Sequence, residues 1–281
     1  MIQRITVLGA GTMGHGIAHA AIIAGYDTTM YDVARPALEQ GSIAIGGIID
    51  KGVDLGKVTG ADAAAAKARL KTTTNLADAV AAADFIIEAA PEKIALKLSL
   101  LNEIEKLAPV GAAIGSNTSS LSVTEMSAAL SNPGRFAGMH FFNPVHKMKL
   151  VEIVRALESS DETLQTIDEV ARRMGKETVV VKDSPGFITS RINAMIGNEA
   201  FYMLQEGVAS PRDIDKALKL GLNHPMGPFE LVDLVGLDTR LSVLEFLHKT
   251  LGEKYRPCPL LVQHVEAGRL GKKVGRGVYD Y

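Results

Sequence analysis

The chain has 281 residues, of which 47% are hydrophobic and 22% charged, and its formal net charge is −2. This composition is typical of a globular protein long enough for two domains, and it contains no Lys- and Arg-rich block that would bind nucleic acid or an anionic membrane. The single cysteine, Cys258, excludes a disulfide framework within the chain and a metal site built from several cysteines. We therefore expect a protein of the reducing cytoplasm with no nucleic-acid partner, and we assign no metal ligands.

The N-terminal residues from Met1 to Gly9 enter a strand-like run directly, without the cationic and apolar regions of a signal peptide. Apolar runs elsewhere, such as the one from Ala18 to Ala24, are far shorter than the ~20 residues that span a bilayer. We expect a soluble chain with no membrane partner.

Up to about residue 182, short runs rich in β-forming residues alternate with longer Ala- and Leu-rich stretches. This is the pattern of a parallel sheet with crossover helices. The segment from Pro36 to Ala68 predicts a long helical excursion with a glycine-broken middle, between the second and third strands. The strands are expected near Ile5–Leu8, Asp27–Tyr31, Phe85–Glu88, Ala112–Ser116, Ala137–Phe141, Val151–Val154 and Thr178–Val181.

The sequence changes character after Val181. Lys182 to Gly186 form a turn or linker signal, and the pattern that follows is helical to near the C-terminus. We place a domain boundary here, with one domain over residues 1–183 and a second over residues 184–281. A helical domain of ~95 residues is small for a core of its own, so we expect it to bury one face against a second copy and to form a homodimer.

The first predicted strand leads into the run Gly9-Ala10-Gly11-Thr12-Met13-Gly14, which opens a helix. Gly9 makes the tight turn, Gly11 lets the backbone approach a pyrophosphate, and Gly14 lets helix and strand pack closely. The phosphates then lie at the positive end of the helix. The fold class is therefore α/β, with an N-terminal Rossmann-type doubly wound sheet that carries the helical excursion, followed by an all-helical C-terminal domain.

Asp32 ends the second predicted strand, 18 residues after Gly14. A carboxylate at this place accepts hydrogen bonds from the adenosine ribose and repels a 2′-phosphate, which favours NAD over NADP. Arg35 lies close enough to complicate that preference. We predict an NAD cofactor held by Gly9, Gly11, Thr12, Met13, Gly14 and Asp32.

The run from Gly138 to Pro144 places a histidine and an asparagine around two aromatic residues at the end of a strand. Ligands of open α/β sheets gather at the carboxyl ends of strands. Glu152 lies in an otherwise apolar run, so it needs a partner if it is buried, and His140 is the natural candidate. A carboxylate on one imidazole nitrogen fixes the tautomer and raises the basicity of the other. From the pattern alone, a structural histidine and an exposed Glu152 stay open.

Two further segments follow strands and join this site by the same reasoning. Ser116 to Ser120 form a hydroxyl cluster, for which a helix cap is the alternative. The run from Glu88 to Glu92, with Lys97 beyond it, is placed to contact the nicotinamide side of the cofactor, and surface charge is the alternative.

Taken together, these motifs resemble the short-chain 3-hydroxyacyl-CoA dehydrogenase family, and within it the bacterial 3-hydroxybutyryl-CoA dehydrogenases. The likeness covers the whole chain. Its most specific elements are Ser116–Leu121, His140–Pro144, Lys182–Phe187, Pro225–Leu231 and Gly271–Tyr279.

The resemblance implies NAD-dependent, reversible oxidation of a short-chain (S)-3-hydroxyacyl-CoA to the 3-oxoacyl-CoA. It implies that His140 and Glu152 form the catalytic acid–base pair and that Ser119 hydrogen-bonds the substrate oxygen. Residues that match cofactor contacts of the family are Glu92, Lys97, Asn143 and Lys273. Lys51 and Lys57, in the helical excursion, match residues that meet CoA phosphates, although two lysines in such a segment are ordinarily solvated.

One position departs from the family pattern, because Ser190 precedes Arg191 where the family often has asparagine. A hydroxyl is shorter than an amide and has one donor instead of two, so a substrate contact there is lost or bridged by water. Two rival functions stay open: a structural protein that binds NAD without acyl-CoA turnover, and a dehydrogenase of small β-hydroxy acids, which would use a lysine base. The acyl chain length and the pathway stay open as well.

Overall fold

The computed structural model describes residues 2–281, which divide into two compact units, one up to Asp183 (unit 1) and the other Ser184–Tyr281 (unit 2). Among the helices described, none is long and apolar enough to cross a membrane.

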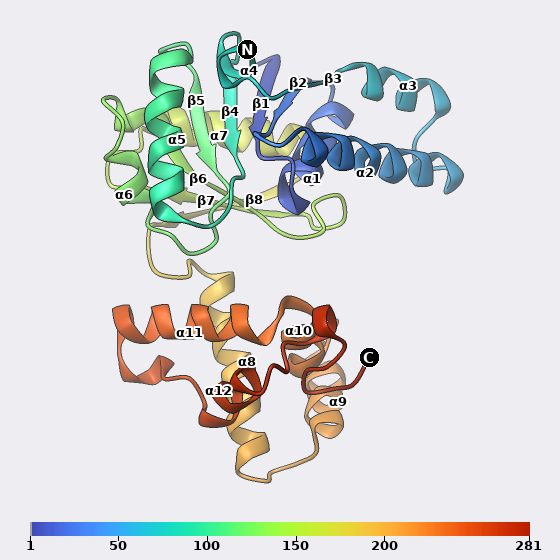
Figure 1. Cartoon of the computed structure of the whole chain (residues 1–281), viewed down its shortest axis with the longest axis vertical. Helices are drawn as coiled ribbons and strands as arrows, with labels where there is room; N and C mark the ends of the chain where they lie inside the picture. Colours follow the sequence, from blue (N-terminus) through green and yellow to red (C-terminus); the bar gives the residue numbers. More distant parts are fainter. Residues whose placement is uncertain (1) are drawn as a thin grey trace. The chain divides into compact units, whose positions relative to one another are not determined.

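Unit 1 is built on one eight-stranded sheet with the order β3-β2-β1-β4-β5-β6-β7-β8 (Figure 1). Neighbouring strands run parallel except β6 and β7, which are antiparallel because only a short connection joins them. The strands are β1 Arg4–Leu8, β2 Asp27–Tyr31, β3 Leu70–Thr73, β4 Phe85–Glu88, β5 Ala113–Ser116, β6 Phe136–Phe141, β7 Leu150–Arg155 and β8 Glu177–Lys182.

The sequence did not reveal the edge strand β3. Its four residues, Leu70–Thr73, show no run of buried apolar side chains that would have marked a strand. The helical excursion is confirmed as α2 Arg35–Asp54 and α3 Gly60–Ala68. The expected glycine-broken middle is confirmed as well, although α2 runs through Gly46 and Gly47 and the break comes at the segment around Gly56. The chain turns after Leu55, where Gly56 has a φ of +66° that suits glycine.

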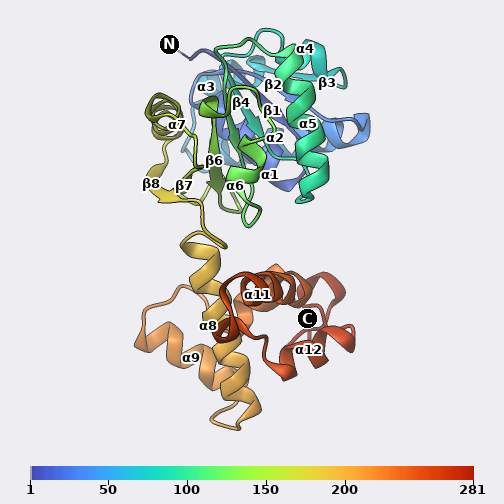
Figure 2. The same cartoon turned by 90° about the vertical axis from the view of Figure 1, so that its left-hand side faces the viewer.

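Helices cover both faces of the sheet, as a doubly wound fold requires. On one face, apolar residues of α1 Thr12–Ile23 and α7 Asp161–Arg173 pack in one core with strand residues such as Val7 and Ile87. Successive strand residues alternate between faces, so Leu8 and Ile86 point to the other side. Figure 2 shows α5 and α7 on opposite sides of the sheet. The remaining helices of this unit are α4 Leu76–Val80, α5 Ile94–Leu107, α6 Val123–Ser127 and the 3-10 turn η1 Pro133–Arg135.

Unit 2 is helical and has a core of its own. Phe201, Phe229 and Leu244 belong to this core, and all three are fully buried. Its carboxyl-terminal segment is held by Asp233, which accepts hydrogen bonds from the amides of Val278 and Tyr279 at 2.8 and 2.9 Å. The elements are α8 Thr189–Gln205, α9 Pro211–Gly221, α10 Pro228–Val235, α11 Leu237–Leu251, α12 Pro259–Glu266 and the 3-10 turns η2 Glu253–Tyr255 and η3 Lys272–Val274.

Candidate active site

A pocket of about 500 Å³ lies in unit 1 where the carboxyl ends of β1, β4, β5 and β6 meet. This is the edge at which open α/β sheets bind their ligands. The fold therefore brings together segments as far apart in the sequence as Gly9 and Phe141. The pocket is lined by Gly9, Gly11, Thr12, Met13, Asp32, Ala89, Ala90, Pro91, Glu92, Asn117, Ser119, His140 and Phe141.

The glycine loop has the geometry that each of its glycines requires. Gly9 has a φ of +106°, and a Cβ there would lie 2.6 Å from the carbonyl oxygen of Ala89. A Cβ on Gly14 would lie 1.8 Å from the carbonyl oxygen of Gly9, so helix α1 can approach the loop only without a side chain. A Cβ on Gly11 would meet nothing within 4 Å, which leaves space on the pocket side.

Asp32, directly after β2, is held by two backbone amides. Its Oδ2 accepts from Ala10 N at 2.9 Å and its Oδ1 from Ala34 N at 3.0 Å. These bonds fix the carboxylate next to the glycine loop, and the lone pairs that remain are available to a hydroxyl donor in the pocket.

His140 and Glu152 are paired by the register of the sheet. In the antiparallel pair β6–β7, His140 lies directly opposite Glu152, so both side chains leave the same face. His140 Nδ1 lies 2.8 Å from Glu152 Oε2. The imidazole is 6% exposed and Glu152 is fully buried, while His140 also lines the pocket. The structure therefore places a buried carboxylate on one ring nitrogen of a histidine at the pocket wall.

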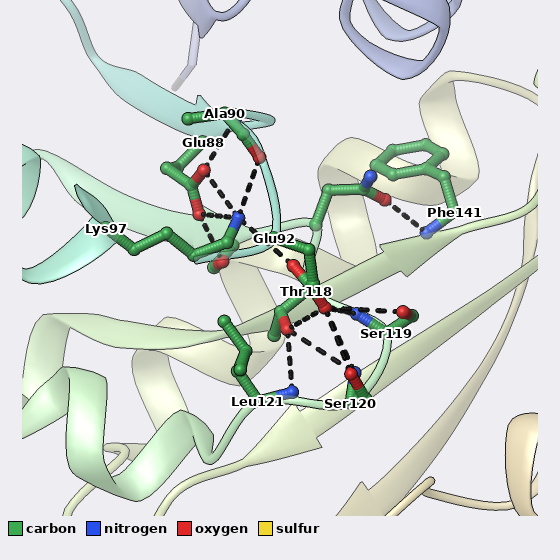
Figure 3. Close-up of polar contacts among 11 residues, drawn as sticks. Glu88, Ala90, Glu92, Lys97, Thr118, Ser119, Ser120, Leu121 and Phe141 are labelled. Atoms are coloured by element: carbon green, nitrogen blue, oxygen red, sulfur yellow. Dashed lines mark hydrogen bonds and ion pairs between the residues drawn. The ribbon is translucent and has the colours of Figure 1, made fainter. Parts of the chain in front are cut away.

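Glu92 and the turn from Thr118 to Leu121 form a compact polar cluster at the end of β5 (Figure 3). Glu92 Oε1 accepts from Thr118 Oγ1 at 2.7 Å, from Ser119 N at 2.8 Å and from Ser120 N at 3.2 Å. Burial alone would raise the pKa of Glu92. The charge of Lys97 and the hydrogen bonds from Thr118, Ser119 and Ser120 outweigh it and hold this pKa below its usual value.

Lys97, on the first turn of α5, is a buried neighbour of this cluster. Its Nζ lies 2.7 and 2.9 Å from the two carboxylate oxygens of Glu88 and 3.1 Å from the carbonyl oxygen of Ala90, and its side chain is 1% exposed. Ser116 Oγ donates to Glu88 Oε2 at 2.5 Å, because Ser116 lies opposite Glu88 on the neighbouring strand. Glu88 thus joins the end of β4 to β5 through Ser116 and to α5 through Lys97.

Reasoning from the sequence missed individual roles for Glu88 and Asn117. Glu88 is an acid at the end of an apolar strand, which is a signal for a buried partner. Asn117 Oδ1 accepts from Phe141 N at 2.8 Å and joins the end of β5 to the strand that carries His140. An asparagine directly after a buried strand indicates a side chain that links two strands. The group to which it hydrogen-bonds cannot be identified without the fold.

Comparison with known proteins agrees with this geometry. The family model of the NAD binding domain of 3-hydroxyacyl-CoA dehydrogenase matches residues 4–184, and that of the C-terminal domain of the same enzyme matches residues 186–281. The chain belongs to the 3-hydroxyacyl-CoA dehydrogenase family. The NAD cofactor, the oxidoreductase activity on 3-hydroxyacyl-CoA and the fold class that the sequence predicts are confirmed.

Full-length relatives support the assignment. The chain is 46% identical to a probable 3-hydroxybutyryl-CoA dehydrogenase of Bacillus subtilis, over 100% of this chain and 98% of that protein. It is 44% identical to a 3-hydroxybutyryl-CoA dehydrogenase of Bradyrhizobium diazoefficiens, over 100% and 96%. The crystal structure of (S)-3-hydroxybutyryl-CoA dehydrogenase from Ralstonia eutropha superposes with a TM-score of 0.97 at 44% identity, and the match covers 100% of this chain and 99% of that one.

Three residues of unit 1 that the family resemblance singles out are not part of the pocket lining, and a fourth belongs to unit 2. Asn143 is exposed, two residues past the end of β6. Lys51, in the last turn of α2, and Lys57, after it, are also exposed. Lys273 belongs to unit 2, where its Nζ lies 2.6 Å from both carboxylate oxygens of Asp238. Within unit 1 the structure groups the glycine loop, Asp32, Glu92, Ser119 and His140 around the pocket, and Asn143, Lys51 and Lys57 are not among its lining residues.

Proposed function

We propose that this member of the family oxidises short-chain (S)-3-hydroxyacyl-CoA, with 3-hydroxybutyryl-CoA as its preferred substrate, and catalyses the reverse reduction. The full-length relatives named for 3-hydroxybutyryl-CoA support the short chain. The observation that carries the mechanism is the His140–Glu152 pair, since His140 lies on the wall of the same pocket as the glycine loop.

The residues of the pocket fit NAD. The space above Gly11 is open, and no side chain caps the amino end of α1, so its first amides are available to a pyrophosphate. Thr12 and Met13 begin that helix, and Asp32, held beside the glycine loop, is proposed to bind the adenosine ribose. When bound, NAD supplies the nicotinamide that accepts hydride from C3 of the substrate. Glu92, Asn143 and Lys273 are proposed to contact the cofactor, as the resemblance implies.

His140 is the proposed acid–base group. Glu152 on Nδ1 holds the ring in the tautomer whose Nε2 carries the lone pair, so Nε2 takes the proton of the 3-hydroxyl during oxidation. Glu152 then stabilises the imidazolium, which returns the proton during reduction. The hydroxyl of Ser119, which also lines the pocket, is proposed to bind the substrate oxygen. His140 on β6 is thus proposed for acid–base catalysis, and Ser119 after β5 for binding the substrate oxygen.

The remaining assignments are proposals of the same kind. Lys51 and Lys57 are exposed and carry positive charge, which suits the phosphates of CoA. Unit 2 exposes large apolar side chains, among them Leu220 and Leu222 at 77% and 65%, and we propose that it forms the interface of a homodimer. The cytoplasm is the proposed compartment, because the one cysteine, Cys258, is free and buried.

The decisive experiment measures NADH formation with (S)-3-hydroxyacyl-CoA substrates of four to sixteen carbons, with NADP assayed in parallel. We expect the highest kcat/KM with the four-carbon substrate. We also expect a preference for NAD over NADP of at least ~100-fold, because the carboxylate of Asp32 would repel the 2′-phosphate of NADP. Turnover that peaks with a long acyl chain overturns the substrate assignment. A comparable rate with NADP overturns the role of Asp32.

A further inference from the structure

Lys176 is a buried lysine that is held by main-chain oxygens. It lies directly before β8 and is 8% exposed. Its Nζ donates to the carbonyl oxygens of Val145 at 2.5 Å and of Met148 at 2.9 Å. Burial lowers its pKa, and no carboxylate of the described residues offsets this effect. Because lysine is rarely buried without an acidic partner, we looked for its role in the loop whose carbonyls it binds.

This loop, residues 142–149, connects β6 and β7, the two strands of the proposed catalytic pair. The amides of Lys147 and Met148 donate to the carbonyl oxygen of Pro144 at 2.9 and 3.1 Å, which folds the loop into a turn. Lys176 binds this turn at two carbonyls from outside it. The ammonium group therefore fixes the path of the backbone after Pro144.

The other side of the loop packs on α1, the helix that the glycine loop opens. Val145 is 2% exposed, and a Cβ on Gly16 of α1 would lie 2.9 Å from Val145 Cγ2, so the two residues meet only because Gly16 has no side chain. The ring centroid of His146 lies 6.2 Å from that of His19, which is also on α1. The β6–β7 loop is therefore held between Lys176 and α1.

Asn143 belongs to the same loop. It is exposed, and it lies two residues before Val145, whose carbonyl oxygen Lys176 binds. The conformations open to a side chain depend on the backbone that carries it. The path of the β6–β7 loop therefore decides where the amide group of Asn143 points.

We propose that Lys176 is a positioning residue that acts through Asn143: by binding the carbonyl oxygens of Val145 and Met148, it holds the β6–β7 loop in the path that directs the Asn143 amide to the cofactor. Lys176 itself is not among the residues that line the pocket. The inference rests on the proposed contact between Asn143 and NAD.

The test is a double-mutant cycle on the affinity for NADH. Lys176→Met removes the donors together with a buried charge that has no counter-ion, so this variant is expected to fold. Asn143→Ala removes the proposed cofactor contact, and a third protein carries both changes. Fluorescence titration without substrate measures the Kd of NADH, and thermal unfolding checks the folding of each protein.

A second variant at the same position protects the test against a poorly folded Lys176→Met. Lys176→Gln keeps a polar side chain, but its amide nitrogen is one bond closer to the backbone than the lysine ammonium group. It takes the place of Lys176→Met in the cycle if that variant does not fold.

We expect each single change to raise the Kd of NADH about 3- to 10-fold, the scale of one lost hydrogen bond. Both changes act on the same contact, so the double variant should bind NADH within ~2-fold of Asn143→Ala instead of showing the product of the two effects. The matched control is Lys149→Met, which removes an exposed lysine of the same loop. Its Kd should stay within ~2-fold of wild type, because Lys149 is not the lysine that binds the turn.

An unchanged Kd in Lys176→Met overturns the proposal. Effects that multiply in the double variant overturn it as well, because Lys176 would then act independently of Asn143. A wild-type Kd in Asn143→Ala removes the contact on which the inference rests and overturns it too. A failure of the proposed substrate is distinguishable, since it shows in the turnover of 3-hydroxyacyl-CoA by wild type and leaves the NADH titrations unchanged.

Discussion

The two units bury charged side chains in different ways. In unit 1, two buried acids each have a basic side chain as partner: Glu88 has Lys97, and Glu152 has His140. In unit 2, the buried Asp233 is held by two amides and the Tyr281 hydroxyl of the C-terminal segment. Paired side-chain charges can exchange or hold protons next to a ligand, whereas a carboxylate saturated by backbone amides fastens one segment to another. The difference therefore separates a reactive site from a structural one.

Two buried basic side chains, one in each unit, test this comparison. His19 on α1 is 9% exposed, and Arg240 on α11 is 5% exposed. Within residues 2–281, neither His19 Nδ1 nor Arg240 Nε has a hydrogen-bond partner. An imidazole can lose its proton when it is buried, but a guanidinium keeps its charge. The two bases should therefore affect stability in different ways.

The largest effect is expected from the pair at the pocket wall. Glu152→Gln keeps a hydrogen-bond acceptor for His140 but removes the charge that stabilises the imidazolium, and His140→Ala removes the base. Each should lower kcat at least ~100-fold, the usual scale of acid–base catalysis, with NAD binding retained. Steady-state assays of NADH formation and titration of NADH fluorescence measure the two quantities.

The matched control for the loss of one carboxylate is Asp161→Asn. Asp161 is 90% exposed and pairs with Arg155 on the surface of the same unit. It should change kcat less than ~2-fold, because exposed ion pairs contribute little. If Glu152→Gln resembles this control, the buried pair is structural and the distinction between the two units does not hold.

The sequence was enough to predict the doubly wound sheet, the glycine loop and the His140–Glu152 pair as a hypothesis, because strand periodicity and turn residues are local signals. It could not supply the register that places His140 opposite Glu152, since that depends on β7 turning back antiparallel to β6. Nor could it show that Lys97 is bound by Glu88 and Ala90, because the partners of a buried side chain are a property of the packed structure. The edge strand β3 lacked a periodic signal altogether.

The second largest effect is a loss of stability at acidic pH that is caused by His19. Burial, together with the nearby positive groups His146, Lys176 and His15, lowers the pKa of His19 from 6.5 to about 4. The unfolded chain therefore binds a proton at this residue between pH 6.5 and 4 while the folded protein does not. Stability from this residue is complete above pH 6.5 and is lost as pH falls toward 4, by up to about 3 kcal/mol.

The comparison variant is His19→Gln, which does not titrate. Urea unfolding at half-unit steps from pH 7 to 4.5 should show a smaller loss of stability on acidification for the variant than for wild type, whatever the stability of the variant at pH 7. Parallel pH profiles would mean that His19 accepts its proton in the folded state without cost, through a partner or a local rearrangement.

The smallest effect is expected at Arg240. Its side chain passes Gly197 of α8, where a Cβ would lie 3.6 Å from Nε, and burial lowers its pKa to about 10, so it stays charged at neutral pH. Arg240 forms no ion pair among residues 2–281, and a buried charge without a counter-ion is unfavourable, so Arg240→Met should raise the free energy of unfolding of unit 2 by about 1–2 kcal/mol. Arg240→Lys keeps the charge and should give no gain. Thermal unfolding of the three proteins at pH 7 measures the difference. Destabilisation by Arg240→Met would mean that the guanidinium meets an anion in the assembled protein, and unit 2 would then match its buried charges as unit 1 does.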